Sequence, residues 1–403
     1  MDKCDYLIIG AGIIGINIAR ELSKRYPDKV IIVIDKENKE AQHASGRNSG
    51  VLHAGFYYTE DSLKAKFTRE GNVAMTTYCE NNNLPIRKCG KLVVAQSNEE
   101  IEVLDELLNR AKKNGVSLEK ITEKEAKQIE PKVKTTKYAL FSPTTSTVDP
   151  RLVVKSMAKD AIENGVIFKF NSAYLKKKKS YIETSSQSIK AEYVINASGL
   201  YADKIAKDYG FSKDHYLLPF KGIYLKSDHP SGYISTNIYP VPQLENPFLG
   251  VHYTITVDGG IKIGPTAIPA FWREQYKGVE NFNMLEFFEI LRQQLGLAVT
   301  SKFGFKKLAM EEMLKYYKPN MVKKATKLCD GFDKKSFSNW STPGIRAQLV
   351  NAREKKLEMD FVIEGDDKSM HILNAVSPAF TCSIPFSKYV VDRIESLTNK
   401  GDS

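Results

Sequence analysis

The sequence has few cysteines, few arginines and no long apolar run, and each shortage excludes a class of protein or of site. No apolar run approaches the roughly 18 residues of a membrane-spanning helix, so an integral membrane protein is excluded. The five cysteines are odd in number, scattered and without C-x-x-C spacing, which argues against a disulfide framework. Histidines and acidic residues do not cluster at ligand spacing, and we predict no metal site. The first residues lack the long apolar region of a signal peptide, so we expect a cytoplasmic protein.

Arginine is scarce, since lysine supplies 47 of the 59 basic residues. The basic residues outnumber the 48 acidic residues, which gives a net charge of +11. A solvated, lysine-rich surface is the ordinary reason for such an excess. Nucleic acid, anionic lipid or a dianionic substrate would also be attracted to it. Net charge does not choose among these partners.

The first 35 residues are typical of a strand, a glycine turn, a helix and a second strand. Residues 6–9 form a continuous apolar run, as expected of a strand buried on both faces of a parallel sheet. The glycine turn over 10–15 follows at once, a helix is predicted over 13–25, and 30–34 form the second apolar run, which ends at Asp35. This context predicts a dinucleotide site rather than a chance set of glycines.

Each glycine of the turn has a separate reason to lack a side chain. Gly10 permits the tight turn, Gly12 lets a pyrophosphate approach the backbone, and Gly15 allows the helix to pack closely on the strand. The helix N-terminus offers unpaired N–H groups to the phosphates. Asp35 can accept hydrogen bonds from both ribose hydroxyls, but the turn alone does not distinguish FAD from NAD.

A second buried strand, ending at residue 195, runs into small residues that include Ala197 and Gly199. Small residues at a strand end let the backbone approach a ligand closely. Two separate segments that close on one dinucleotide favour FAD, which binds in an extended form.

The fold class that these patterns predict is α/β, with a Rossmann-like FAD-binding domain and an inserted substrate domain built on an antiparallel sheet over about 216–272. The FAD-binding domain is expected from 1–80, 145–215 and 335–403, and the substrate-binding domain from 81–144 and 216–334. Further helices are predicted over 98–114, 122–130, 151–164, 282–296, 306–328 and 381–397.

Residues 44–58, with the sequence ASGRNSGVLHAGFYY, resemble the segment under the flavin in the L-2-hydroxyglutarate dehydrogenase/oxidase family, within the D-amino-acid-oxidase-like superfamily. A second specific match is GIRAQ at 344–348. Weaker matches in the same order extend the resemblance from residue 5 to about 385. It implies an FAD enzyme that oxidises a 2-hydroxy acid.

The resemblance and the patterns above also assign residues to the cofactor. They lie in the glycine turn, after the second strand, in the flavin segment, after the second buried strand, in the GIRAQ block and before the last helix. The set is Gly10, Gly12, Ile14, Gly15, Asp35, Lys36, Ser45, Arg47, Asn48, Ser49, Gly50, Ala197, Gly199, Arg346, Ser377, Pro378 and Ala379.

Oxidation of a 2-hydroxy acid needs a base for the hydroxyl proton, and histidine has a suitable pKa. Among only six histidines, His53 lies in the flavin segment and His252 ends an apolar run of the expected substrate sheet. His53 is the first candidate for the base and His252 the second. The choice between them stays open.

The substrate carboxylate needs a cationic clamp, for which arginine is suited because its guanidinium binds a carboxylate in bidentate fashion. Arg346 is the first candidate, and Lys221 and Arg273 are weaker ones. Lys221 stands where the family usually has arginine, so a point charge replaces a planar fork.

The predicted reaction is oxidation of an L-2-hydroxy acid, most simply L-2-hydroxyglutarate to 2-oxoglutarate, by hydride transfer to flavin N5. The electrons would pass to an acceptor other than nicotinamide, with quinone as one option. The alternatives are an amino-acid or amine oxidase, a glycerol-3-phosphate-type dehydrogenase, or a non-catalytic or nucleic-acid-associated flavoprotein. We expect a small-molecule partner and no nucleic acid, and the oligomeric state is left open.

A strongly basic segment over 302–335 bears on the electron acceptor, because it holds ten lysines and four acidic residues. It also contains an apolar stripe at helical spacing. Its members are Met310, Met313, Leu314, Tyr317 and Met321. The stripe either faces the core beneath a solvated lysine face, or it belongs to an element that docks on the inner face of a membrane.

Overall fold

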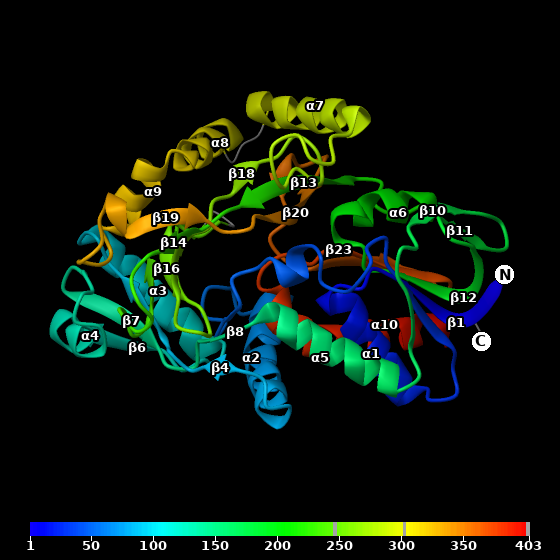
Figure 1. Cartoon of the computed structure of the whole chain (residues 1–403), viewed down its shortest axis with the longest axis horizontal. Coiled ribbons are helices and arrows are strands. Elements are labelled where there is room, and N and C mark those ends of the chain that lie inside the picture. The colour runs from blue at the N-terminus through cyan, green and yellow to red at the C-terminus, as the bar shows by residue number, and fades with distance from the viewer. Residues whose placement is uncertain (245–247, 301–303, 400–403) are drawn as a thin grey trace. The chain divides into compact units, whose positions relative to one another are not determined.

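The computed structural model describes residues 1–244, 248–300 and 304–399, which divide into two compact units (Figure 1). The first unit contains residues 1–48, 150–219 and 346–403, and the second contains 49–149 and 220–345. The predicted boundaries differ mainly over 49–80, which belong to the second unit. The reason is local pairing, because β3 (Val51–Leu52) is antiparallel to β8 (Ser146–Val148).

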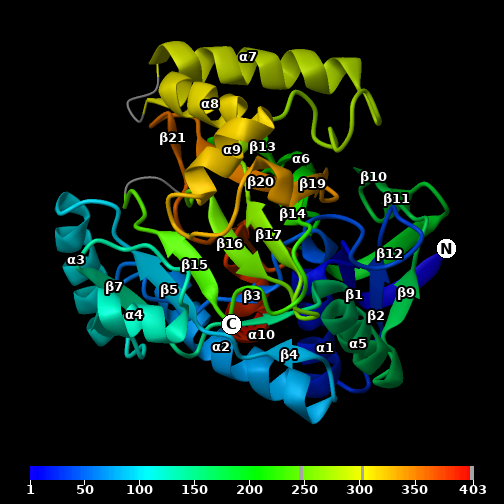
Figure 2. The same ribbon diagram turned by 60° about the vertical axis from the view of Figure 1, so that its left-hand side comes forward.

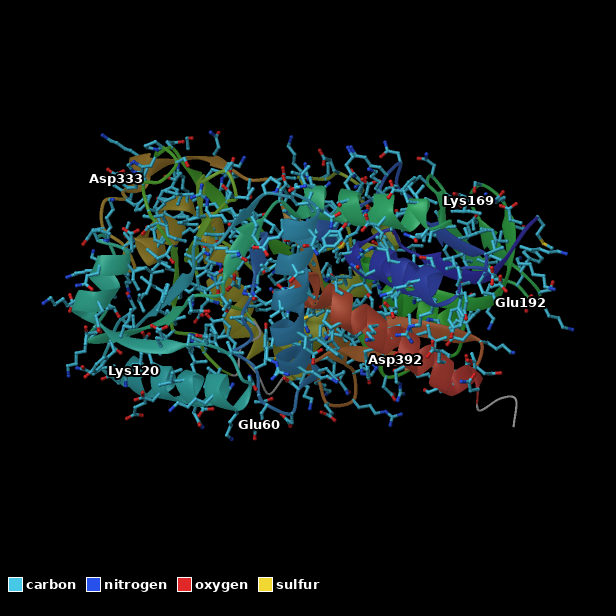
Figure 3. All side chains as sticks on the ribbon, turned by 90° about the horizontal axis from the view of Figure 1, so that it is seen from below. Glu60, Lys120, Lys169, Glu192, Asp333 and Asp392 are labelled. Atoms are coloured by element: carbon cyan, nitrogen blue, oxygen red, sulfur yellow. The ribbon has the colours of Figure 1, made fainter. Side chains whose placement is uncertain are left out.

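The first unit is built on an eight-stranded sheet whose centre is parallel. Its strands are β1 (Asp2–Ile9), β2 (Ile31–Ile34), β9 (Ile167–Lys169), β10 (Tyr174–Lys177), β11 (Ile182–Thr184), β12 (Ser188–Asn196), β22 (Val362–Gly365) and β23 (Ser369–Asn374). β1 lies between β2 and β12, with Ile9 beside Ile34 and Asn196. The carboxyl ends of the three central strands therefore meet at the glycine turn. Lys169 of β9, which Figure 3 labels, also forms a salt bridge of 2.7 Å with Asp2 of β1.

Three helices pack together in the first unit (Figure 1). They are α1 (Ile13–Arg25), α5 (Pro150–Glu163) and α10 (Ala379–Thr398), and α6 (Ala202–Asp208) is a fourth. Asn17 of α1 joins the three, because its Nδ2 lies 3.2 Å from Met157 Sδ and 3.4 Å from Ser383 Oγ. The helices predicted over 13–25, 151–164 and 381–397 are confirmed.

The second unit contains a second eight-stranded sheet, mostly antiparallel, as the sequence predicted for its central part. Its order is β19 (Phe337–Trp340), β14 (Leu225–Ser227), β17 (Ile261–Gly264), β16 (His252–Ile255), β15 (Asn237–Pro240), β5 (Lys91–Val94), β7 (Tyr138–Ser142) and β6 (Glu119–Thr122). β15 and β5 form the one parallel pair among the pairings described for this sheet. Its apolar face packs on α9 (Lys318–Ala325) through Met321 and Val322.

The remaining helices of the second unit are α2 (Leu63–Asn81), α3 (Glu99–Lys113), α4 (Glu123–Ile129), α7 (Met284–Thr300) and α8 (Phe305–Met313). The sequence predicted all of these except α2. Short strands are β4 (Ile86–Arg87), which pairs with β8, and β18 (Ile268–Pro269), which pairs with the end of β13 (His215–Gly222). β20 (Gly344–Asn351) pairs with β21 (Lys356–Leu357).

The helix predicted over 306–328 is interrupted. α8 ends at Met313, a short 3-10 turn follows, and Pro319 lies in the first turn of α9, where proline is tolerated. Met321 is buried, but the other four members of the predicted stripe are exposed. The interpretation in which this stripe faces the core is therefore wrong for Met310, Met313, Leu314 and Tyr317. Residue 302, where the basic segment begins, lies outside the described residues.

Within the described ranges, no helix combines the length and the apolar character that crossing a membrane requires.

Candidate functional site

The glycine turn is packed so tightly that side chains are excluded. Gly10 has φ +112°, and a Cβ atom there would lie 2.5 Å from the carbonyl oxygen of Ala197. A Cβ atom on Gly15 would lie 2.0 Å from the carbonyl oxygen of Gly10. Gly12 is less crowded, because a Cβ atom added there would lie 3.0 Å from Ser45 Oγ. The roles predicted for Gly10 and Gly15 thus have a direct steric basis.

The start of α1 and the end of β2 complete a cradle that suits a dinucleotide. The Ile13 N–H donates to Ser45 Oγ over 2.9 Å, and Asp35 Oδ2 accepts from the Ala11 N–H over 2.7 Å. Asp35 Oδ1 accepts from the Glu37 N–H over 2.9 Å. A carboxylate has lone pairs beyond these two bonds, so Asp35 can still accept from ribose hydroxyls. A close backbone turn, a helix N-terminus and an acid are the parts that FAD binding needs, and the residues present fit it.

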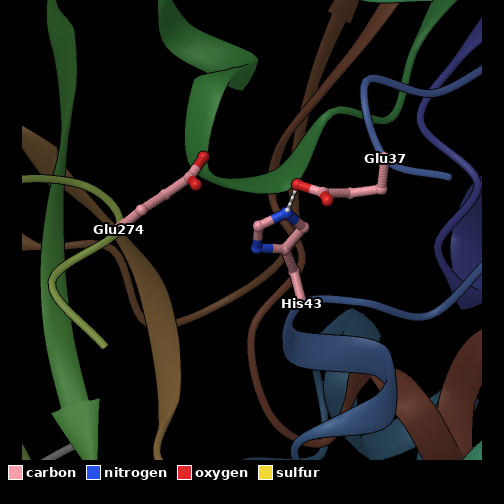
Figure 4. Close-up of side chains that lie close together, drawn as sticks. All are labelled: Glu37, His43 and Glu274. Atoms are coloured by element: carbon pink, nitrogen blue, oxygen red, sulfur yellow. Dashed lines mark hydrogen bonds and ion pairs between the residues drawn. The ribbon is translucent and has the colours of Figure 1, made fainter. Parts of the chain in front are cut away.

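The first part of the flavin segment is fixed by its own hydrogen bonds. Arg47 Nε donates to the Gln42 carbonyl over 2.6 Å, and Asn48 Nδ2 donates to the Ser45 carbonyl over 2.8 Å. His43 Nε2 lies 2.9 Å from Glu37 Oε1 (Figure 4). Lys36 also pairs with Glu37, at 2.7 Å, so this lysine is positioned beside the acid that follows β2.

The other residues predicted for the cofactor lie on both units. Ala197 and Gly199 follow β12, and Ser377 to Ala379 precede or begin α10. Ile14 is buried in α1. Ser49 and Gly50 belong to the second unit, where their carbonyls accept from Lys262 Nζ at 3.1 Å and from the Val148 N–H at 2.9 Å.

In the second unit, one face of the sheet carries polar residues on four adjacent strands. Tyr239 lies next to His252, because Ile238 pairs with Tyr253. Lys262 is opposite Thr254, two residues from His252 and so on the same face. Lys91 shares this face through Val93, which pairs with Tyr239. We call Lys91, Tyr239, His252 and Lys262 the polar face.

His252 is held in one orientation and one tautomer. Its ring stacks on Tyr239, with centroids 3.7 Å apart and an interplanar angle of 17°. Its Nδ1 lies 2.8 Å from the carbonyl oxygen of Gly250. A carbonyl only accepts, so Nδ1 carries the proton and Nε2 keeps its lone pair. Burial, with a smaller contribution from nearby lysines, lowers the pKa of His252 to about 3.

His53, the first candidate for the base, directly follows β3 and is 9% exposed. Its backbone carbonyl accepts from Asn72 Nδ2 of α2 over 3.2 Å. This bond fixes the backbone at His53. Both candidate histidines therefore belong to the second unit.

The candidates for the carboxylate clamp differ in environment. Lys221 lies near the end of β13, and its Nζ donates to the Tyr316 hydroxyl over 3.4 Å; burial lowers its pKa. Arg346 lies half-buried in β20, in the first unit. Arg273 is fully buried, with Glu286 and Glu289 of α7 at 3.8 and 3.9 Å, so we assign it a structural role.

Lys91, Tyr239 and Lys262 are the polar-face residues that the sequence did not single out. Lys91 begins an apolar strand, KLVV, and such a residue normally reaches solvent. Its full burial depends on rings from distant parts of the chain. A lysine inside an otherwise apolar strand was the only signal that the sequence carried.

Comparison with known proteins identifies the family. Residues 5–393 match the family described as FAD dependent oxidoreductase. The chain is 36% identical to the L-2-hydroxyglutarate dehydrogenase of Indibacter alkaliphilus, over 94% of this chain and 95% of that protein. It is 34% identical to the mitochondrial L-2-hydroxyglutarate dehydrogenase of Nematostella vectensis, over 96% and 90%.

Solved structures agree on the fold. An L-alpha-glycerophosphate oxidase from Mycoplasma pneumoniae, with FAD bound, has a TM-score of 0.74 at 21% identity, covering 98% of this chain and 95% of that one. Glycine oxidase from Geobacillus kaustophilus has a TM-score of 0.73 at 17% identity, covering 98% and 95%. At such identities the likeness concerns the fold alone. With the family match, the full-length relatives and the cradle in the first unit, the chain belongs to the FAD-dependent oxidoreductases, uses FAD as its cofactor, and falls among the L-2-hydroxyglutarate dehydrogenases.

Proposed function

We propose that this protein oxidises L-2-hydroxyglutarate to 2-oxoglutarate and passes the electrons to an acceptor other than nicotinamide. The observation that carries the proposal is the polar face, where an uncharged imidazole shares one face of the sheet with the buried Lys91 and the half-buried Lys262. A base and nearby cations are what a 2-hydroxy acid with two carboxylates requires. The names of the full-length relatives support the same substrate.

The chain's own residues account for binding and proton transfer. His252 Nε2 accepts the proton of the C2 hydroxyl, while Nδ1 stays bonded to the Gly250 carbonyl. Lys221, in the same unit as His252, is our candidate for holding the carboxylate next to the reacting carbon. FAD, when bound, supplies the acceptor for the electron pair of the C2–H bond. An imidazole already stacked on Tyr239 needs no reorientation before it accepts the proton.

A substrate panel tests the proposal. We expect the FAD-loaded protein to reduce an artificial dye with L-2-hydroxyglutarate and to produce 2-oxoglutarate without ammonia. The D-enantiomer, L-amino acids and glycerol 3-phosphate should give rates at least about 100-fold lower, as for sites that reject a substrate through misplaced polar groups. Ammonia release from an amino acid, or faster turnover of glycerol 3-phosphate, would move the protein to another activity of the same fold.

We further propose that the acceptor is a membrane quinone, reached by docking of α7 and α8 on an anionic membrane surface. The two helices lie side by side in the second unit (Figure 2). α7 buries the polar Glu286 and Gln294 along with Ile290 and Leu297, and it exposes other apolar residues at helical spacing. The exposed series is Leu285, Phe288, Leu295 and Val299, of which Leu285 is 83% and Val299 86% exposed.

The neighbouring α8 and the turn after it extend this apolar surface and add charge. Met310, Met313, Leu314 and Tyr317 are exposed there. Lysines 306, 307, 323 and 324 are exposed in α8 and α9. Exposed apolar area of this extent marks an interaction surface, and lysines beside it favour anionic lipid by roughly 1 kcal/mol each. Lys315 does not contribute, because it is buried in an ion pair with Glu312.

Vesicle binding tests the docking proposal. We expect the protein to sediment with vesicles containing anionic phospholipid and to be released as salt rises from about 50 to about 500 mM, because the attraction of the lysines is screened. Changing Lys306, Lys307, Lys323 and Lys324 to glutamine should weaken binding at least about tenfold and slow quinone reduction, with dye reduction unchanged.

Two results would oppose this proposal. One is a protein that ignores anionic vesicles at low salt. The other is a stable dimer in solution that dissociates when Leu285 and Phe288 become serine, since the apolar face would then be an interface between two copies. Changing Lys159 and Lys179 of the first unit, both exposed, to glutamine is the matched control and should leave binding unchanged.

A further inference from the structure

Lys91 is a buried cation for which the described part of the chain provides no hydrogen-bond acceptor. It begins β5, its exposed fraction is 0%, and its Nζ has no partner among the described residues. The Tyr57 hydroxyl, also buried, likewise has no partner there. An unsatisfied buried donor destabilises a fold, and a buried ammonium does so more strongly. Two such donors, one of them on a ring that the lysine amine contacts, indicate a site for an acceptor that the chain itself does not supply.

The surroundings of Lys91 stabilise its charge only in part. Its Nζ lies 4.5 Å from the ring centroid of Phe56, 4.6 Å from that of Tyr57 and 4.9 Å from that of Tyr239. Aromatic faces attract a cation but carry no net charge and accept no strong hydrogen bond. Burial accordingly lowers the pKa of Lys91 to about 7. The group that would complete this cage is an anion.

Tyr239 links the cage to the proposed base. One ring of Tyr239 contacts Lys91 Nζ and stacks on His252. β5 and β16 are separated by β15, and Lys91 is two residues along β5 from the position level with His252, so the two residues start about 12 Å apart. An extended five-carbon diacid, with a hydrogen bond of about 3 Å at each end, covers a similar distance. The separation therefore suits a substrate with its reacting carbon at His252 and its far end at Lys91.

We propose that Lys91 Nζ and the Tyr57 hydroxyl form the subsite for the second carboxylate of the substrate, so that Lys91 selects 2-hydroxy acids that carry two carboxylates. This inference rests on the proposed function, whose substrate it explains. The wall of the cage beside Phe56 and Tyr57 consists of side-chain rings rather than backbone.

Lys91 is also the group near the subsite that changes protonation when an anion binds. Tyr57 and Tyr239 face it from the segment after β3 and from β15, and His252 of β16 stacks on Tyr239. Burial raises the pKa of both tyrosines and lowers that of His252, so these three stay uncharged near neutral pH. Lys262, further along the polar face, already donates to the Ser49 carbonyl. Carboxylate binding should therefore raise the pKa of Lys91 and take up a proton.

The test compares two substrates on the FAD-loaded enzyme. L-2-Hydroxyglutarate and L-2-hydroxypentanoate have the same chain length, and only the first has a second carboxylate. We expect Lys91→Met to lower kcat/KM for the diacid at least about 100-fold, mainly through KM, and to change that for the monoacid less than about threefold. Tyr57→Phe should lower the diacid value about five- to tenfold. Lys132→Met, which removes a lysine over the ring of Tyr233, is the matched control and should change neither value.

Binding of glutarate, which cannot react, provides a second readout that does not depend on turnover. Calorimetry at pH 7 in buffers of different ionisation enthalpy should show uptake of about half a proton by the wild type. It should show none for Lys91→Met.

Failure of the subsite and failure of the proposed function give different results. If the wild type oxidises the diacid and Lys91→Met keeps the same preference over the monoacid, the subsite is wrong and the function stands. An equal loss for both substrates also overturns the subsite, since Lys91 would then only support the fold. If the wild type does not oxidise the diacid but binds glutarate with Lys91-dependent proton uptake, the subsite stands and the proposed substrate is wrong. If Lys91→Met does not fold, Tyr57→Phe is used instead, and the decision rests on its ratio of kcat/KM for the diacid to kcat/KM for the monoacid.

Discussion

Replacing Gly15 by alanine is expected to yield a protein without flavin. The added Cβ atom would lie 2.0 Å from the carbonyl oxygen of Gly10, which is backbone and cannot move aside like a side chain. The start of α1 must therefore shift away from β1, and the N–H groups of its first turn no longer point toward the phosphates. We expect the fraction of protein that retains FAD after purification to fall below about a tenth, since a shift costing about 1.4 kcal/mol already weakens binding tenfold.

Absorbance at the flavin band relative to protein absorbance measures this loss. Circular dichroism and a titration of the apoprotein with FAD separate weaker binding from unfolding. Gly296→Ala is the matched control, because nothing lies within 4 Å of a Cβ atom there and alanine favours the helix α7. Stoichiometric FAD in Gly15→Ala would contradict the steric argument and with it our placement of the cofactor.

The cradle was predictable from the sequence because its parts are close in the chain. Strand, glycine turn, helix and acid all fall within the first 35 residues, and the spacing of Gly10, Gly15 and Asp35 follows from local geometry. The packing of Gly10 against Ala197 was also within reach, since a strand that ends in small residues signals a close approach.

Helix α2 was missed for a physical reason. Its buried positions include Lys64, Thr68 and Asn72, so its sequence lacks the apolar period that reveals an amphipathic helix. One signal was present at its start, where the Ser62 hydroxyl accepts from the Ala65 N–H over 3.1 Å and caps the helix. Without α2, the grouping of 49–80 with the second unit was also missed.

The direction in which an apolar face points is a property of the fold rather than of the sequence. The spacing over 310–321 identified an apolar stripe, but periodicity does not say whether a stripe meets the core or solvent. In α7 the core side is taken by Glu286, Ile290 and Gln294, with Glu286 close to the buried Arg273. Because Glu286 turns toward the buried Arg273, the apolar side of α7 faces solvent.

His252→Gln is expected to lower kcat by a factor of about 10² with little change in KM, because a base contributes mainly in the transition state and an imidazole with a pKa of about 3 is a weak one. Glutamine keeps a polar group near Tyr239 but cannot accept a proton at neutral pH. The kinetic isotope effect, which is the ratio of kcat with ordinary substrate to kcat with C2-deuterated substrate, should rise as well, since the chemical step then limits turnover. His53→Gln is the comparison, and we expect less than about a tenfold effect from it.

The pH profile of the wild type checks the same assignment. The imidazole is uncharged above its pKa of about 3 and is lost as a base only when the pH falls through that value. His252 should therefore cause no decline of kcat/KM between pH 8 and pH 5.

At the alkaline side, Lys91 and Lys262 have pKa values lowered by burial to about 7 and about 8, and they lose their charge as the pH rises through those values. KM for the diacid should rise there while kcat stays nearly constant. A decline of kcat near pH 6.5, abolished by His53→Gln and unaffected by His252→Gln, would instead make His53 the base.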